Sequence, residues 1–391
     1  MSRWRLLPSW VKSVILALAT VVLYVVTARL GLTLALPPEK KATAVWLPSG
    51  IALAAMLIGG YRLWPGIWLG AFIANAWDIF DPANQFPFSA HLIVSCGIAT
   101  GSTLQPLAGA WLLHRWIGSD GLYDGARSTF KFVGITLLAC LIASTIGVTM
   151  LTVTGIAPWS RFAFAWWTWW VGDTIGILIV SPLVLSWSRL PRRLWQPLRL
   201  AEAGLLLVLL LGVTSLVFAG WNLWGFVAGT LTYLTVPLLV WATFRFGQHG
   251  ATASLLLVSK IAVWGTAHGH GPFVQPTLNE SLLLLQTFVG VLAVTTLALA
   301  GTLTERHRAE EAKASAIHQL ERALQEIKTL RGLIPICAWC KKIRNDAGLW
   351  EQLEAYLRHH TEARFSHGIC PDCLDKRRVL DPHADRNDTA P

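Results

Sequence analysis

The strongest constraint on the fold is a series of apolar runs that are separated by short polar connections. A helix needs about 20 apolar residues to cross the roughly 30 Å hydrocarbon core of a bilayer. Most of the runs reach or approach that length, and they cover residues 11–36, 43–59, 62–77, 89–113, 130–154, 163–187, 201–219, 223–244, 250–267 and 281–303. The sequence therefore predicts an all-α polytopic membrane protein with about ten transmembrane helices, plus or minus two.

The composition agrees with this fold class and argues against a water-exposed surface. Hydrophobic residues make up 54% of the chain and charged residues 14%. Residues 1–303 hold 17 Lys/Arg against 8 Asp/Glu, so most of the net charge of +10 lies in the apolar part. These cations fall in short connections between apolar runs. We therefore expect the lipid bilayer to be a partner, and we expect no nucleic-acid partner.

The distribution of basic residues predicts the orientation of the chain. With ten helices and a cytoplasmic N-terminus, the outer loops carry only Lys40, Lys41 and Arg161. The inner loops carry Arg62, Arg115, Arg127, Lys131, Arg189, Arg192, Arg193, Arg199 and Arg245. Because positive loops are retained inside, both termini are predicted to be cytoplasmic in a multi-pass inner-membrane protein.

The runs 43–59 and 62–77 leave two arrangements open. Only the residues Gly-Gly-Tyr-Arg at 59–62 separate the two halves, and Pro48 and Pro65 lie near their starts. The pair could form a tight hairpin or two broken half-helices.

Three ionisable residues, Arg29, Asp173 and Lys260, fall inside apolar runs, where charge is costly and usually functional or paired. Asp173 is the best candidate because it lies between two glycines and follows a group of tryptophans that includes Trp169 and Trp170. Aromatic faces and one anion could form a pocket for a cationic or polyol ligand. An ion pair of Asp173 with Arg29 or Lys260 is the structural alternative.

After residue 303 the sequence becomes polar and rich in strong helix formers. The apolar positions Ile317, Leu320, Leu324, Ile327 and Ile334 are three, four, three and seven residues apart, as in a short coiled-coil seam. We expect residues 304–332 to form a helical linker. It is either a solvated helix or the stalk of a homodimer.

Residues 333–378 contain two Cys-x-x-Cys pairs, which predict a metal site. Each pair can direct both of its thiolates to one ion, so Cys337, Cys340, Cys370 and Cys373 would complete a closed tetrahedral zinc shell. A domain of about 45 residues rarely folds without such a structural ion. A redox dithiol and an iron–sulfur cluster are the alternatives. Residues 379–391 are expected to be a disordered tail.

Four segments in a fixed order, at 46–75, 169–185, 239–273 and 280–306, carry a family resemblance. Over residues 11–305 the chain closely resembles the bacterial membrane-associated sensor domain of the first type, in the MASE family. The cysteine module resembles a short module of bacterial signalling proteins. The resemblance implies a sensory domain, 1–303, that relays a signal to a cytoplasmic signalling protein.

The sequence after the apolar runs contains no recognisable kinase or cyclase motif. We therefore expect a signalling protein that is not an enzyme. A membrane transporter or a transport-associated subunit is the alternative, because prolines and charges lie within or beside the apolar runs.

Overall fold

The computed structural model describes residues 8–33, 43–77, 87–118, 125–188, 196–220, 231–331, 335–345, 347–360, 364–366 and 368–380. The chain divides into two compact units, Met1–Glu310 and Glu311–Pro391. Part of the predicted run 223–244 and nearly all of the predicted tail 379–391 lie outside the described residues.

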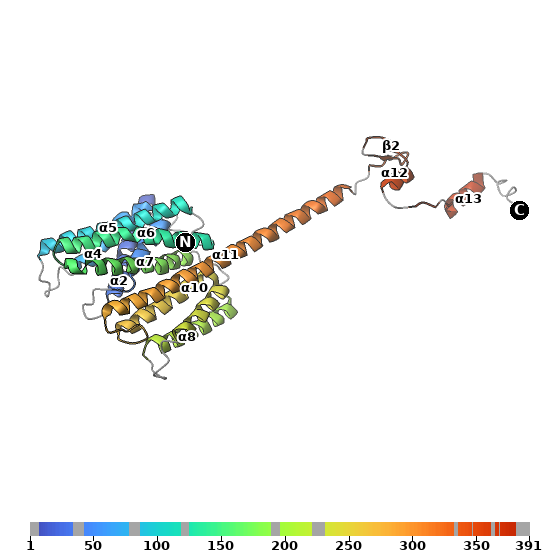
Figure 1. The fold of residues 1–391 in the computed structure, drawn as a ribbon. Coiled ribbons are helices and arrows are strands. Elements are labelled where there is room, and N and C mark those ends of the chain that lie inside the picture. The colour runs from blue at the N-terminus through green and yellow to red at the C-terminus, as the bar shows by residue number, and fades with distance from the viewer. Residues whose placement is uncertain are drawn as a thin grey trace. The chain divides into compact units, whose positions relative to one another are not determined.

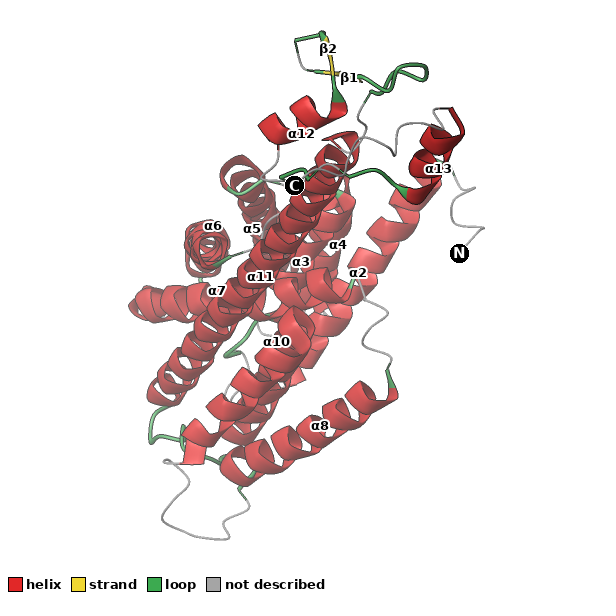
Figure 2. Ribbon diagram, turned by 90° about the vertical axis from the view of Figure 1, so that its right-hand side faces the viewer, coloured by secondary structure: helices red, strands yellow, loops and turns green. Residues whose placement is uncertain are grey.

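The first unit is a bundle of helices that run largely alongside one another (Figures 1 and 2). Helix α5 packs along α4 and α6, α6 packs along α7, and α8 packs along α10. Helices suit hydrocarbon because they satisfy their backbone hydrogen bonds internally. The described helices of this unit are α2 (Ser9–Thr33), α3 (Leu47–Gly59), α4 (Trp64–Ala76), α5 (Phe88–Trp116), α6 (Ala126–Val153), α7 (Phe162–Trp187), α8 (Pro197–Phe218), α10 (Thr235–Ala267) and the part of α11 (Leu278–Arg331) that precedes the unit boundary.

Six helices in the described part of the chain are long and apolar enough to cross a membrane. They contain the predicted runs in α2, α6, α7, α8, α10 and α11, and α3 is a shorter apolar helix. The all-α, polytopic class is therefore confirmed. The number of ten membrane crossings stays a prediction.

Helix α10 is interrupted at Gly247, which joins two helical halves. Gly247 has φ 59° and ψ −142°, a conformation outside the helical region that glycine adopts without a side-chain clash. A Cβ placed on Gly250 would overlap the carbonyl oxygen of Ala242. Residues eight apart in one straight helix would be separated by roughly 12 Å. The chain therefore folds back sharply at Gly247, between the predicted runs 223–244 and 250–267.

The segment 47–76, for which the sequence left a tight hairpin or two half-helices open, forms two short helices that make few contacts with each other. Each of α3 and α4 has 13 residues and a proline in its first turn, and the 3₁₀ turn Tyr61–Leu63 lies between them. Gly60 has φ 79°, which ends α3. A 13-residue helix is roughly 20 Å long, which is shorter than the hydrocarbon core.

Contacts between helix ends connect the positions that were predicted to face the cytoplasm. A Cβ on Gly125, just before α6, would overlap the Glu305 carboxylate of α11. These regions are therefore at the same end of the bundle. The other contacts are Tyr61 with His114 (ring centroids 6.2 Å apart), Lys131 Nζ with the Trp116 carbonyl oxygen (3.0 Å), Arg245 Nε with Glu202 Oε2 (2.6 Å), Gln248 with Thr304 (3.3 Å) and Trp187 with His249 (ring centroids 5.8 Å apart).

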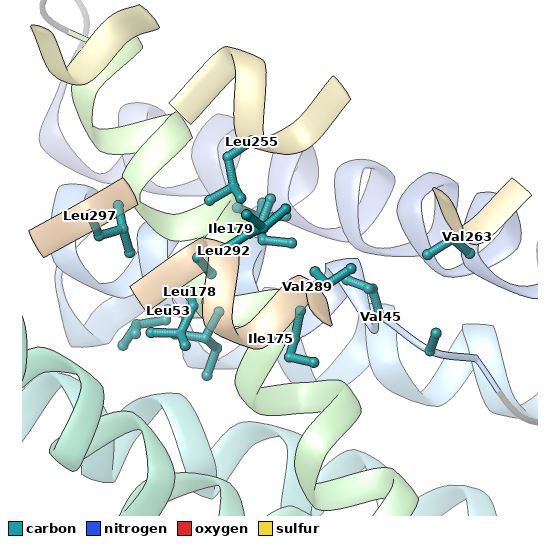
Figure 3. Close-up of a cluster of buried hydrophobic side chains, with 14 of the residues drawn as sticks. Val45, Leu53, Ile175, Leu178, Ile179, Leu255, Val263, Val289, Leu292 and Leu297 are labelled. Carbon is teal, nitrogen blue, oxygen red and sulfur yellow. The ribbon is translucent and has the colours of Figure 1, made fainter. Parts of the chain in front are cut away.

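The core of the bundle lies where α3 and α7 meet α10 and α11. Figure 3 shows Leu53 of α3 and Leu178 of α7 together with Leu292 of α11. Glycines bring α3 and α7 into backbone contact, since a Cβ on Gly176 would overlap the carbonyl oxygen of Trp46. Gly172 and Gly176 are spaced as in the small-residue motifs that allow close helix packing in membranes.

The second unit contains little buried apolar surface. After the end of α11, its described elements are β1 (Ile343–Arg344), which pairs antiparallel with β2 (Trp350–Glu351), and the helices α12 (Leu353–His360) and α13 (Pro371–Leu380). In the described part of this unit, Ile343 is the one hydrophobic side chain that is buried. Such a small core agrees with the expectation that folding needs a further constraint.

Replacement of Gly176 by alanine tests the backbone contact between α3 and α7. We expect Gly176→Ala to destabilise the bundle by roughly 1–3 kcal/mol, because the added methyl forces the two helices apart. Unfolding of the purified protein by SDS in mixed micelles measures this change. The control is Gly212→Ala on α8, where no atom lies within reach of the new Cβ. Equal stability of the two variants would refute the contact.

Candidate functional site

The candidate site is centred on Asp173, whose side chain is enclosed between α7 and the first turn of α3. Asp173 is 1% exposed, and the Ser49 hydroxyl donates a hydrogen bond of 2.9 Å to its Oδ1. The Trp169 side chain, one turn earlier on α7, also hydrogen-bonds to this carboxyl group. The helix dipole of α3 has its positive end at Ser49 and favours negative charge there.

The glycine contact explains why Ser49 reaches Asp173. The backbone N–H of Trp46, the residue before α3, donates to the Gly172 carbonyl oxygen at 3.0 Å. Further along both helices, the Ser181 hydroxyl donates to the Gly50 carbonyl oxygen at 2.9 Å. These two hydrogen bonds fix the register between α3 and α7, and Ser49 lies between them.

The other two predicted ionisable residues lie elsewhere. The Arg29 guanidinium lies over the Trp77 ring, 4.2 Å from its centroid, which is a cation–π geometry. Lys260 is exposed on the surface of the bundle. No lysine or arginine in the described part of the chain pairs with Asp173. The alternative of an ion pair with Arg29 or Lys260 is therefore not what the structure shows.

Further polar side chains surround Asp173 and extend the site to α2, α5 and α6. Tyr24 is buried near Asp173 and interacts with Ser102 and Trp46. Cys140 is buried beside Thr174 and accepts a hydrogen bond from Gln105 Nε2, with 3.5 Å between nitrogen and sulfur. We define the Asp173 cluster as Asp173, Ser49, Trp169, Tyr24 and Cys140.

The two predicted tryptophans have different roles. The six-membered ring of Trp169 lies where a Cβ on Gly147 would be, so this ring fills the gap between α6 and α7 beside Asp173. Trp170 instead donates its indole N–H to the Leu137 carbonyl oxygen of α6 at 2.8 Å and stacks on Trp166. Trp169 therefore belongs to the site, whereas Trp170 holds α7 against α6.

An enclosed carboxylate with no cation beside it has a limited set of chemical uses. A buried charge without a counter-charge is costly in a membrane protein, so the group needs a proton or a cationic ligand for neutrality. The described cluster contains no second carboxyl group or histidine beside Asp173. The arrangement therefore suits the binding of a proton or a cationic ligand, or a change of helix packing.

The four cysteines of the second unit form two separate turns. The Cys337 carbonyl oxygen accepts from Lys341 N at 3.0 Å, and the Cys370 carbonyl oxygen accepts from Leu374 N at 3.0 Å. Backbone N–H groups also point at the first sulfur of each turn, chiefly those of Cys340 and Cys373, and they lower the pKa values of Cys337 and Cys370. Lower thiol pKa values favour the thiolates that bind metal.

The two turns do not come together in the structure. Within the described ranges, no three His, Cys, Asp or Glu side chains are placed to share one ion. The four-thiolate zinc site therefore stays a prediction. The small core of this unit gives a physical reason, because few apolar contacts are present to hold the turns together.

Sequence reasoning missed Ser49, Tyr24, Cys140, Gln105 and Gln286. The two glutamines carried a usable signal, since an amide inside an apolar run must find partners within the protein. Gln286 Nε2 does so by donating to the carbonyl oxygens of Ala44 and Thr168, at 3.3 Å each. Ser49, Tyr24 and Cys140 carried little signal, because such residues are common in membrane helices.

Together, the apolar bundle and its enclosed carboxylate define a multi-pass membrane protein with a polar centre. The family model for MASE1, a membrane-associated sensor domain, matches residues 16–307. The chain belongs to this family, which confirms the resemblance noted over residues 11–305. No curated protein and no solved structure matches the chain.

A double-mutant cycle tests the hydrogen bond between Ser49 and Asp173. We expect Ser49→Ala and Asp173→Ala to show a coupling energy on the order of 1 kcal/mol, as for the stronger interhelical hydrogen bonds in membranes. SDS unfolding of the four proteins gives this value. The control cycle pairs Asp173→Ala with Ser181→Ala, because the Ser181 hydroxyl donates to the Gly50 carbonyl oxygen rather than to Asp173. The assignment fails if both cycles give the same coupling energy.

Proposed function

We propose that this protein is a sensory and signal-transduction protein that relays a ligand or membrane signal to a cytoplasmic signalling protein, without a catalytic output domain of its own. The observation that carries the proposal is α11, an unbroken helix from Leu278 to Arg331. Its first part packs in the core through Val289 and Leu292, and its later part is polar and exposed. A shift of the helix in the core is thereby passed directly to the polar segment.

The basic residues at the helix ends that contact one another support one orientation of the protein in the membrane. The end of the bundle that contains Arg62, Arg115, Lys131 and Arg245 also contains Thr304 and Glu305 of α11, where the polar segment begins. Basic ends are retained in the cytoplasm. This end, and with it the C-terminal unit, is therefore cytoplasmic in the bacterial inner membrane.

The polar segment of α11 supports a homodimer. Ile317, Leu320 and Leu324 are 46%, 62% and 52% exposed, and they follow the spacing of a coiled-coil seam. Ion pairs such as Arg306–Glu310, with 2.9 Å between Nε and Oε1, lie on the surface of the same helix. A second copy of the chain would bury the apolar stripe, and two such helices could change register as a unit.

The cysteine module is the part that would face the cytoplasmic partner. A structural zinc ion held by Cys337, Cys340, Cys370 and Cys373 would supply the constraint that its small core lacks. The backbone N–H groups that point at Cys337 and Cys370 support this role, because they stabilise thiolates before metal arrives.

A transporter is the second candidate, and the short helices α3 and α4 favour it. Broken helices whose N-terminal ends point at an enclosed site are typical of secondary transporters. Helix α3 begins beside Asp173 in this way. A transporter has no need for a response in the polar segment of α11, so the relay experiment below separates the two candidates.

The thiols and the metal are tested by alkylation of the full-length protein in detergent. In zinc-free protein, Cys337 and Cys370 are expected to react with iodoacetamide at lower pH than in urea, since their lowered pKa values give more thiolate in the folded state. One equivalent of zinc should then protect all four tail cysteines, and Cys96 serves as the internal control. Mass spectrometry quantifies each site. The assignment would be contradicted if the folded protein and the protein in urea had the same pH profile of alkylation, or if zinc gave no protection.

The relay is tested by photo-crosslinking from position 320. Full-length protein with p-benzoylphenylalanine in place of Leu320 should crosslink to a second copy in membranes, whereas the same group in place of Arg322, on the opposite side of the helix, should not. Asp173→Asn should change the crosslinked fraction by about twofold or more, because the bundle repacks around the lost charge.

Insertion of three glycines after Glu311 supplies the control for the relay. The insertion breaks α11 and should abolish the effect of Asp173→Asn on the crosslink. A crosslinked fraction that is identical with and without Asp173→Asn would overturn the proposed relay.

A further inference from the structure

A groove of about 260 Å³ lies between α6, α7 and α11, next to the Asp173 cluster. Its walls are almost entirely apolar, and among the described residues no lysine, arginine, aspartate or glutamate lines it. The walls are formed by Val133 and Leu137 of α6, by Trp167, Val171, Thr174, Ile175 and Leu178 of α7, and by Leu283, Gln286, Thr287, Gly290, Val291 and Val294 of α11.

The groove opens toward the hydrocarbon rather than toward water. Trp167, Leu283 and Val291 on its edges are 46%, 50% and 58% exposed, and all three belong to the membrane-crossing parts of α7 and α11. A molecule dissolved in the membrane can therefore enter from the side. For scale, a cavity of about 150 Å³ holds benzene, so this groove accommodates on the order of ten non-hydrogen atoms.

Gln286 lines the groove and carries a buried side-chain amide whose hydrogen bonds are only partly satisfied. The residue is 2% exposed, and its Nε2 donates to two carbonyl oxygens, those of Ala44 and Thr168. Because both neighbours accept hydrogen bonds, the amide must face them with its nitrogen. Its Oε1 is then left over, and it has no hydrogen-bond partner in the described part of the chain.

The two threonines of the groove, like Gln286, each have an oxygen atom that can still accept a hydrogen bond. The Thr174 hydroxyl already donates to the Trp170 carbonyl oxygen at 2.8 Å, and the Thr287 hydroxyl donates to the Leu283 carbonyl oxygen at 2.7 Å. Because each hydroxyl proton is already donated, the hydroxyl oxygens can only accept further hydrogen bonds. A ligand that satisfies these oxygens must therefore donate a hydrogen bond, and a groove without charged residues favours a neutral ligand.

We propose that this groove binds a neutral, membrane-dissolved amphiphile with one alkyl chain and a hydroxyl group that donates to Gln286 Oε1. The alkyl chain lies between Val133 and Leu137 on one side and Val291 and Val294 on the other. The hydroxyl group satisfies an acceptor that would otherwise remain buried without a partner, which is destabilising in proteins.

The position of the groove connects such a ligand to both parts of the relay. One wall contains Ile175, two residues from Asp173, and the facing wall contains Gly290 of α11. A Cβ on Gly290 would meet only Ile175, at 4.0 Å. Occupancy therefore fixes the separation of α7 and α11. This consequence rests on the proposed function, whereas the binding itself does not.

The test uses full-length protein in lipid nanodiscs and a decanol that carries a photoreactive diazirine on its chain. Crosslinked peptides are mapped by mass spectrometry, with unlabelled n-decanol and n-decane as competitors. We expect labels on α6, α7 and α11 that decanol removes and decane does not. Labelling that decane removes equally well would show an ordinary lipid contact and overturn the proposal.

Two variants identify the groove and the hydroxyl contact. Gly290→Leu fills the groove and should abolish the labelling, whereas its control Gly212→Leu on α8, with open space around it, should retain it. Gln286→Leu should reduce the advantage of decanol over decane by about fivefold or more, as expected for one lost hydrogen bond. Size-exclusion chromatography and circular dichroism confirm that each variant is folded. Unchanged labelling in Gly290→Leu would refute the site.

The outcome for the groove is separate from the outcome for the relay. Specific labelling with no effect of decanol on the position-320 crosslink would retain the binding site and remove its signalling role. A relay that responds to Asp173→Asn without any specific labelling would retain the proposed function and remove this ligand class.

Discussion

The close contact of α3 with α7 is the interaction on which the rest of the bundle depends. Glycines at both helices allow their backbones to touch, and hydrogen bonds from Trp46 to Gly172 and from Ser181 to Gly50 set the register. In hydrocarbon there is no water to satisfy a misplaced polar group, so a slipped register would leave these groups unpaired. The same contact encloses Asp173 against the first turn of α3.

This enclosure explains how one carboxyl group could control the packing of several helices. Asp173 has hydrogen-bond partners on α3 and α7, and Tyr24 and Cys140 bring α2 and α6 to the same place. Arg29 does not pair with Asp173, since its guanidinium lies over the Trp77 ring. A change of charge at Asp173 therefore meets no counter-ion among the residues that the structure describes, and it must be met by a ligand or by movement of helices.

Helix α11 is the element that combines the polar centre, the groove and the polar segment after residue 303. Gln286 on α11 reaches the backbone beside Gly172, Gly290 faces Ile175 across the groove, and the helix then continues to Arg331. A single continuous helix with contacts at several sites is a physical means of coupling them, provided that its packing has two states. The MASE1 membership agrees with a sensory use of this arrangement.

The sequence by itself determined the helical, membrane-crossing class and the sensor family, because hydrocarbon restricts which residues a span tolerates. It also singled out Asp173 as a candidate site residue. The turn between two apolar runs at Gly247 also followed from the sequence, since arginine and glutamine interrupt the hydrophobicity there. Only the tertiary structure decided that Ser49 rather than Arg29 or Lys260 meets Asp173, and that Gln286 keeps an unpaired oxygen beside a groove. These contacts join residues more than one hundred positions apart, and their choice depends on helix register, which a pattern of apolar residues does not encode.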